Sequence, residues 1–151
     1  MSDTLVLTWE KLDDLVSRLA DGVGRDHDLV LAITRGGLVP AGMLAYRLAL
    51  REILVAGAEF YRDGGGTHPA PVIGHFPDPS LLAGQRVLVV DEVWETGETM
   101  TEVLARVRAA GGTAVSAVIH YKPGRSRVAS APDHWAATVD GWVTYPYKAG
   151  G

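Results

Sequence analysis

The sequence predicts an α/β domain in which helices flank a central parallel sheet. Two short segments, 29–33 and 87–90, contain only apolar residues, as expected for strands that are buried on both faces. Each is followed by a glycine-containing turn and then by apolar residues at helical spacing. A third apolar segment, 114–120, comes directly after the second of these helices, which implies a parallel, right-handed strand-helix-strand unit. Sheets of this class bind ligands beyond the carboxyl ends of their strands.

Apolar spacing predicts three helices. The first should begin after Thr8, a suitable N-cap, and end at Asp21-Gly22. The second covers 38–50 and has a proline in its first turn, where proline is tolerated. The third starts after the turn at 95–99 and ends at Gly111-Gly112. The apolar stripes of the first and third helices are Leu12, Leu15, Val16 and Leu19, and Met100, Val103, Leu104 and Val107.

The rest of the chain indicates further strands and one irregular segment. A strand is expected over 53–61, and a short aromatic strand or extended arm over 141–147. Between residues 62 and 84, glycines, prolines and two histidines replace any regular period, which predicts a mobile flap or irregular subdomain with a short strand near 71–76.

Length and composition point to one globular domain over residues 1–151. The chain has 18 Asp and Glu against 14 Lys and Arg, a net charge of -4, which argues against nucleic acid as the main partner. The lack of cysteine excludes disulfides, thiolate zinc sites and cysteine nucleophiles, and it fits a reducing cytoplasm. The chain has neither a signal-like start nor an apolar run of about 20 residues, so no membrane association is expected.

Acidic and hydroxyl side chains gather where the strand at 87–90 ends. Asp91 and Glu92 close this strand, and a Glu-Thr-Gly-Glu-Thr turn leads into the next helix. Buried carboxylates are costly unless they bind hydroxyls, a metal or a cation, whereas a helix N-terminus with glycine and hydroxyls suits a phosphate. Together these features indicate a sugar-phosphate site. The alternative is that Thr96 and Thr99 only cap the helix and that the acids only complement its dipole.

Four segments carry a resemblance to the type I phosphoribosyltransferases. VLVVDEVWETGET resembles the family motif for phosphoribosyl pyrophosphate (PRPP), and TRGGLVPAGMLA resembles the pyrophosphate-binding turn of the xanthine-guanine and hypoxanthine enzymes. HYKPGR resembles their purine-recognising lysine segment, and GWVTYP resembles their base-stacking segment. The resemblance implies the type I fold, with a flap or hood at about 60–84 and 134–151, and a homodimer or homotetramer. It also implies Mg2+-dependent transfer of the phosphoribosyl group of PRPP to N9 of a 6-oxopurine, in cytoplasmic purine salvage.

The resemblance assigns the PRPP contacts residue by residue. Asp91 and Glu92 would bind the ribose hydroxyls, one of them through Mg2+, and are therefore the candidate metal ligands. Glu95 stands where the family has an acid, normally Asp, that acts as general base or stabilises the proton at purine N7. Two turns supply the remaining contacts, with Thr96, Gly97, Glu98 and Thr99 around the 5'-phosphate and Thr34, Arg35, Gly36 and Gly37 at the pyrophosphate.

The turn at 34–37 also has a simpler interpretation, as a plain strand-to-helix turn with a surface arginine. In the family, the peptide bond that enters the first glycine of this turn is often cis. A non-proline cis bond is rare and is found mainly at functional sites. The resemblance therefore predicts a cis bond between Arg35 and Gly36.

Three residues are assigned to the purine. Lys122 offers only donors, so it favours the O6 oxygen of a 6-oxopurine over the amino group of adenine. Trp142 offers a face for stacking, and the backbone of Val143 would read the ring edge. Without the resemblance, Lys122 would be interpreted as a solvated lysine at a strand end, and Trp142 equally well as a core residue.

Two segments depart from the family pattern. Shortly after the stacking segment the family commonly has an Asp that helps to hold a second Mg2+, where this chain has Lys148. The flap offers Arg62, His68 and His75 in place of the usual pyrophosphate-binding Lys or Arg. The two histidines are candidates for contacting the leaving group, and the alternative is that they are solvated or structural loop residues. These departures keep open a non-catalytic PRPP- or nucleotide-sensing regulator with the same fold. Transfer to a non-purine acceptor such as a pyrimidine is disfavoured by the purine-site residues.

Overall fold

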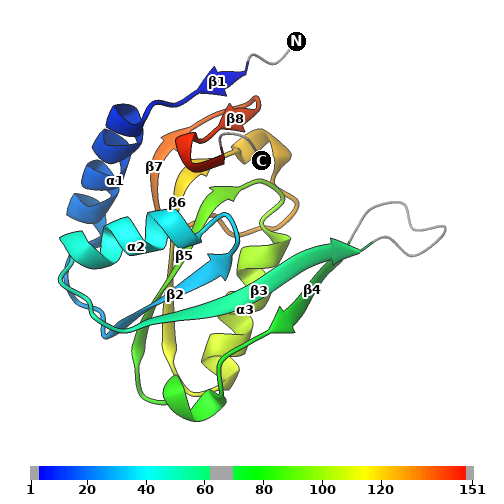
Figure 1. Cartoon of the computed structure of the whole chain (residues 1–151). Coiled ribbons are helices and arrows are strands. Elements are labelled where there is room, and N and C mark those ends of the chain that lie inside the picture. The colour runs from blue at the N-terminus through cyan, green and yellow to red at the C-terminus, as the bar shows by residue number, and fades with distance from the viewer. Residues whose placement is uncertain (1–3, 62–69, 149–151) are drawn as a thin grey trace.

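The computed structural model describes residues 4–61 and 70–148. Within them the chain forms helices, strands and short 3-10 turns that follow one another as Figure 1 shows. In chain order these are β1 (Leu5–Val6), α1 (Trp9–Val23), β2 (Leu29–Thr34), α2 (Leu38–Arg47), β3 (Ile53–Tyr61), β4 (Ala70–His75), a 3-10 turn (Pro79–Leu81), β5 (Arg86–Trp94), α3 (Glu98–Ala109), β6 (Thr113–Tyr121), a 3-10 turn (Pro123–Arg125), β7 (His134–Thr138), β8 (Val143–Thr144) and a 3-10 turn (Pro146–Lys148).

The longer strands form one sheet in the order β4-β3-β2-β5-β6-β7. Neighbouring strands are parallel except for β3 and β4, which form an antiparallel edge. The short strands β1 and β8 pair in parallel as a separate two-stranded sheet (Figure 1). The predicted fold class, an α/β domain with a central and mostly parallel sheet, is therefore confirmed.

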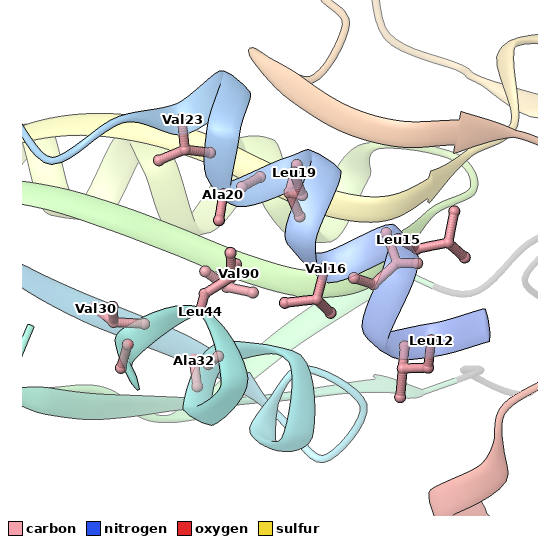
Figure 2. Close-up of a cluster of buried hydrophobic side chains, with 14 of the residues drawn as sticks. Leu12, Leu15, Val16, Leu19, Ala20, Val23, Val30, Ala32, Leu44 and Val90 are labelled. Carbon is pink, nitrogen blue, oxygen red and sulfur yellow. The ribbon is translucent and has the colours of Figure 1, made fainter. Parts of the chain in front are cut away.

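Different helices cover the two faces of the sheet. Successive side chains of a strand point to opposite faces. Val30 and Ala32 of β2 pack with α1 and α2 in one buried cluster (Figure 2), whereas Leu31 and Ile33 pack with α3 in the other. The result is three layers, with α1 and α2 on one face and α3 on the other, which is why residues 29–33 of β2 and 87–90 of β5 are all apolar.

The first helix begins as predicted and runs one residue further than predicted. The Thr8 side chain accepts a hydrogen bond from the Lys11 N–H at 3.1 Å, as an N-cap does. The helix passes through the predicted end at Asp21-Gly22 because Val23 extends its buried stripe. It ends at Val23 and is capped by Gly24. No helix in the described part of the chain has the length and apolar character needed to cross a bilayer.

The second helix is shorter than the predicted 38–50. It ends at Arg47, and Ala49 adopts a positive φ of 57° that interrupts the helical path. Leu48 and Leu50 are nevertheless packed against the core, Leu48 at 4% exposure. Their apolar character therefore reflects burial of the loop rather than continuation of the helix.

The strand predicted at 87–90 continues through the acidic residues to Trp94. Its pairing with β6 extends to Val93 opposite His120 and Trp94 opposite Tyr121. Asp91 and Glu92 are consequently adjacent strand residues. Since strand side chains alternate, the two carboxylates face opposite sides of the sheet.

The edges of the molecule hold the elements that the sequence did not reveal. β7 and β1 were not predicted, because HWAAT has no apolar alternation and β1 has only two residues. Of the segment 141–147, predicted as a strand or an extended arm, only β8 is a strand, and a 3-10 turn follows it. The short strand predicted near 71–76 is confirmed as β4, which pairs antiparallel with β3. Of the candidate pyrophosphate contacts in the flap, Arg62 and His68 lie outside the described residues.

A buried chain of hydrogen bonds joins the C-terminal segment to the sheet. His120 of β6 is only 1% exposed, and its Nδ1 lies 2.8 Å from the Tyr145 hydroxyl. That hydroxyl donates to the backbone carbonyl of Glu92 at 3.3 Å. Burial, reinforced by the nearby charge of Lys122, lowers the pKa of His120 to about 4. The imidazole is therefore neutral at neutral pH.

This shift makes stability depend on pH in a defined window. Between about pH 6.5, the ordinary pKa of His, and about pH 4, the unfolded chain binds a proton at residue 120 that the folded chain does not. The contribution of His120 is thus fully present above pH 6.5 and is lost as the pH falls toward 4, by an amount on the order of 3 kcal/mol. Urea unfolding at several pH values should show this slope in the wild type and a shallower one in His120→Gln.

His75→Gln is the matched control, because His75 is exposed on β4. Its unfolding free energy should follow the wild type across the same pH range. Equal slopes for His120→Gln and the wild type would contradict the assignment of a neutral, buried His120.

Candidate active site

A pocket of about 520 Å³ opens at the carboxyl ends of β2 and β5. These strands are neighbours in the sheet, but α2 follows β2 on one face and α3 follows β5 on the other. Such a switch point leaves a crevice between the two connections, which is where open α/β sheets bind ligands. Of the predicted site residues, the structure brings together at this pocket Thr34, Gly36, Asp91, Glu92, Glu95, Thr96, Gly97 and Thr99. Its lining does not include Arg35, Gly37, Glu98, Lys122, Trp142 and Val143.

The turn after β5 presents the N-terminus of α3 to the pocket. Gly97 is the N-cap, with a left-handed φ of 86° and no side-chain capping bond, and α3 begins at Glu98. The Thr96 hydroxyl accepts a hydrogen bond from the Glu98 N–H at 3.3 Å. Thr96 therefore makes a helix-capping contact. The first-turn N–H groups of a helix still lack intrahelical partners and attract anions, so this contact is compatible with phosphate binding.

Trp94 supports this turn from within the protein. It is 2% exposed, and its indole N–H donates to the Ser126 hydroxyl at 3.2 Å. A Cβ added at Gly97 would lie 2.5 Å from the Trp94 Nε1 atom, so the turn is in close contact with the ring. The Thr96 carbonyl also accepts from the Arg127 N–H at 2.8 Å. The turn is thus fixed from two sides.

The turn after β2 contains two glycines in close contact with β5. A Cβ at Gly37 would lie 2.5 Å from the Val90 carbonyl oxygen, and one at Gly36 would lie 2.6 Å from the carboxyl carbon of Glu92. The turn contains a cis peptide bond, at Thr34-Arg35 rather than at the predicted Arg35-Gly36. The prediction was wrong by one residue, because the resemblance identifies the turn and not the bond within it.

Asp91 and Glu92 have different surroundings. Burial, reinforced by the charge of Glu92, raises the pKa of Asp91 to about 7, although the N–H of Glu92 donates to Asp91 Oδ1 at 2.8 Å and Lys148 lies nearby. Glu92 is 9% exposed, and both of its carboxylate oxygens are engaged. Oε1 accepts from the Tyr147 hydroxyl at 2.8 Å, and Oε2 accepts from the Lys148 ammonium at 2.5 Å. Burial and the charge of Glu92 raise the pKa of Tyr147 above its ordinary value.

These carboxylates are hard oxygen donors of the kind that Mg2+ prefers. Within residues 4–61 and 70–148, no three His, Cys, Asp or Glu side chains gather into a metal site. Mg2+ is, however, commonly held by one or two carboxylates together with substrate phosphates. Asp91 fits that mode because it lines the pocket, whereas the Glu92 oxygens already bind Tyr147 and Lys148.

Lys122 and Glu95 form an ion pair beside the pocket. The Lys122 ammonium donates to Glu95 Oε2 at 3.1 Å, and Arg125 lies 3.9 Å from the other carboxylate oxygen. The Lys122 side chain is only 6% exposed, so it is not the solvated lysine of the alternative interpretation. The pair sets a cationic donor and an anionic acceptor side by side.

Trp142 is a surface residue and Val143 belongs to the core. Trp142 is 64% exposed, which excludes the core interpretation, whereas the Val143 side chain is 7% exposed. The carbonyls of Trp142 and Thr144 accept from the N–H groups of Leu5 in β1 and of Leu7, just after β1, at 2.8 and 2.9 Å. Backbone groups alternate along a strand, so those of Val143 face away from β1.

A second cavity, of about 590 Å³, lies beside the β3–β4 hairpin. Arg35 and the flap residue His75 both line it, and Thr34 lines this cavity as well as the first. The structure therefore brings Arg35 and His75 to one cavity, which adjoins the pocket of the candidate phosphate site at Thr34.

Sequence reasoning missed three aromatic residues that hold the site together. Trp94 had no predicted role, and Tyr145 and Tyr147 were interpreted only as part of an aromatic strand. The available signal was the aromatic run from Trp142 to Tyr147. Its contacts with Glu92 join residues more than fifty positions apart, which local sequence patterns do not encode.

Gly97→Ala should destabilise the protein. A left-handed φ costs an L-residue about 1–2 kcal/mol, and the added methyl would also displace Trp94. We expect a loss of at least about 1 kcal/mol in the free energy of unfolding, measured by urea denaturation. Gly42→Ala is the matched control, because its Cβ meets open space within α2 and alanine favours a helix. A Gly97→Ala variant as stable as the wild type would contradict this account of the turn.

Comparison with known proteins agrees with the geometry. Residues 6–144 match the family model described as a phosphoribosyl transferase domain. The chain is 30% identical over 155 aligned positions to the xanthine-guanine phosphoribosyltransferase of Ruegeria sp. (strain TM1040), covering 93% of this chain and 83% of the relative. The solved purine phosphoribosyltransferase of Pyrococcus horikoshii is similar with a TM-score of 0.82 and 28% identity, over 99% of this chain and 96% of the other. A Neisseria gonorrhoeae protein solved with bound ppGpp is similar with a TM-score of 0.86 and 28% identity, over 99% and 91%. The resemblance identified from the sequence is confirmed, and the chain belongs to the phosphoribosyl transferase domain family.

Proposed function

We propose that this protein transfers the 5-phosphoribosyl group of PRPP to N9 of a 6-oxopurine, giving a nucleoside 5'-monophosphate and pyrophosphate. The observation that carries the proposal is the ion pair between the buried Lys122 and Glu95, set next to a helix N-terminus and two strand-end carboxylates. The Lys122–Glu95 pair suits the edge of a purine, whereas the helix N-terminus and the two carboxylates suit a sugar phosphate. The oligomeric state and the cytoplasmic location stay predictions.

The sugar phosphate would lie over the end of β5. The turn at 95–99 would receive the 5'-phosphate, because its N–H groups and the dipole of α3 favour an anion. Asp91, which lines the same pocket, would accept hydrogen bonds from the ribose hydroxyls. The turn at 34–37 would receive the pyrophosphate, with Arg35 and the amides after it as donors.

Mg2+ bound with PRPP would neutralise the charge of the pyrophosphate, and Asp91 is the side chain that would hold it. The contribution of the protein is electrostatic and positional. Negative charge grows on the departing pyrophosphate as its bond to C1 breaks, and preorganised donors in the turn at 34–37 stabilise that charge. Enclosure by the flap would exclude water, which otherwise competes with the base.

The purine would occupy the space between the Lys122–Glu95 pair and Trp142. Lys122 would donate to O6, while Glu95 would accept the proton that N7 carries. Trp142, with its exposed ring, would stack on the base, and the backbone of Val143 would read the ring edge. Glu95 is longer than the usual Asp by one methylene and is held by Lys122 on one side, which keeps its carboxylate beside the O6 donor.

The named relatives support a purine acceptor, because the Ruegeria relative is a xanthine-guanine enzyme and the Pyrococcus structure is a purine enzyme. The bound ppGpp of the Neisseria protein supports a site of this shape that holds a guanine nucleotide. It also keeps the nucleotide-sensing regulator as the alternative function. Turnover distinguishes the two functions, because only the enzyme would release pyrophosphate.

The deciding experiment offers PRPP and Mg2+ with guanine, xanthine, hypoxanthine, adenine and uracil in turn. We expect pyrophosphate release with one or more of the 6-oxopurines, and none with adenine or uracil. Release with uracil would favour a pyrimidine acceptor. Binding of PRPP or ppGpp without release from any base would overturn the enzyme and favour the regulator.

Glu95→Gln should lower turnover by about 10²–10⁴-fold, as expected for loss of a general base, while the affinity for PRPP stays nearly unchanged. Steady-state rates and PRPP titrations measure the two effects separately. Glu95→Asp restores the usual acid and should retain most of the turnover. Glu102→Gln, on the exposed face of α3 next to Arg106, is the matched control and should behave as the wild type. Unchanged turnover in Glu95→Gln would remove Glu95 from this role.

A further inference from the structure

We propose that Lys148 is a positioning residue that supplies a permanent positive charge at Glu92, in the place where a divalent cation would otherwise bind this carboxylate. The inference rests on the proposed function, since it concerns the cation that accompanies PRPP. It deepens that function by assigning direct contact with this cation to Asp91 and to the phosphates of the ligand, and not to Glu92.

The contacts around Glu92 account for both of its oxygens. Lys148 donates to Oε2 at 2.5 Å and Tyr147 donates to Oε1 at 2.8 Å. Both donors come from one short 3-10 turn, Pro146–Lys148, at the end of the described chain. The carboxylate is therefore held by the C-terminal segment as a unit.

The carboxylate also has little room to turn. Its carbon lies 2.6 Å from the position of a Cβ at Gly36, so the turn after β2 packs directly against the carboxylate. The Glu92 side chain is 11% exposed, whereas that of Lys148 is 44% exposed. The lysine reaches in from solvent and brings its charge to a carboxylate that is almost fully enclosed.

The electrostatics of this arrangement oppose a second cation. A buried carboxylate needs a compensating positive charge, and the Lys148 ammonium provides one. A divalent cation could reach Glu92 only by displacing Lys148, and it would then be repelled by the displaced ammonium nearby. Asp91, one residue earlier, points to the other side of the strand. Both acids line the pocket, but the oxygens of Glu92 are taken up by Tyr147 and Lys148. The two acids of the motif thus have separate tasks.

The test measures cation binding without turnover. Mn2+ is titrated into the full-length protein in the absence of PRPP and the free ion is followed by electron paramagnetic resonance. Lys148→Met should bind Mn2+ at least about tenfold more tightly than the wild type, because Glu92 becomes available. Lys148→Arg keeps the charge and should bind as the wild type does. Lys11→Met removes an exposed lysine of α1 and should leave Mn2+ affinity unchanged.

A double-mutant cycle shows whether the effect passes through Glu92. In a Glu92→Gln background, Lys148→Met should give less than about a threefold gain, because the carboxylate it would release is absent. An equal gain in both backgrounds, or no gain in either, would overturn the proposal. Thermal unfolding confirms that each variant is folded, and Lys148→Gln replaces the Met variant if that one has lost its transition.

This outcome is separate from that of the base assay. An inactive protein whose Mn2+ cycle depends on Glu92 would leave the role of Lys148 intact and overturn the enzyme. An active protein whose Mn2+ cycle does not depend on Glu92 would support the enzyme and overturn the role of Lys148.

Discussion

The adjacency of β2 and β5, with their following helices on opposite faces of the sheet, is the constraint on which the rest of the site depends. It places two strand-to-helix turns next to one another and leaves a crevice between them. The backbone of each turn must then pass very close to neighbouring residues, and a glycine stands at each point of contact. Gly36 contacts Glu92, Gly37 contacts a β5 carbonyl, and Gly97 contacts Trp94. The glycines follow from the topology, because larger side chains would separate the elements that form the pocket.

Charge in this site is arranged in pairs. The chain as a whole is acidic, with a net charge of -4, and its proposed ligand is a polyanion. Two acids of the site are matched with a lysine, Glu95 with Lys122 and Glu92 with Lys148. Asp91 instead has a pKa raised to about 7 by burial, so a bound cation would favour its ionised form. The net charge therefore says little about the ligand, since local pairing and the dipole of α3 decide the potential that the ligand meets.

The C-terminal segment, residues 145–148, links the ends of several strands of the sheet. Tyr147 contacts Glu92 and lies 3.3 Å from the carbonyl of Gly36, which joins residues 111 positions apart. Tyr145 adds a buried link to His120. One short segment thus holds the turn after β2, the end of β5 and the end of β6 in a common geometry. The ion pair of Lys148 with Glu92 is one of these links, so folding of the segment and the electrostatics of the pocket are coupled.

The sequence by itself determined the α/β class, the positions of the three helices and the two turns that carry the candidate site, because apolar periodicity and glycine-containing motifs are local. It also determined the family, through motifs that cover most of the chain. Only the tertiary structure decided that β5 runs through its acids, that β7 joins the sheet edge, and that the cis bond precedes Arg35. The tertiary structure alone also decided that Glu92 accepts hydrogen bonds from Tyr147 and Lys148. These features arise from contacts between residues that are distant in the chain, where pairing and burial outweigh local preference.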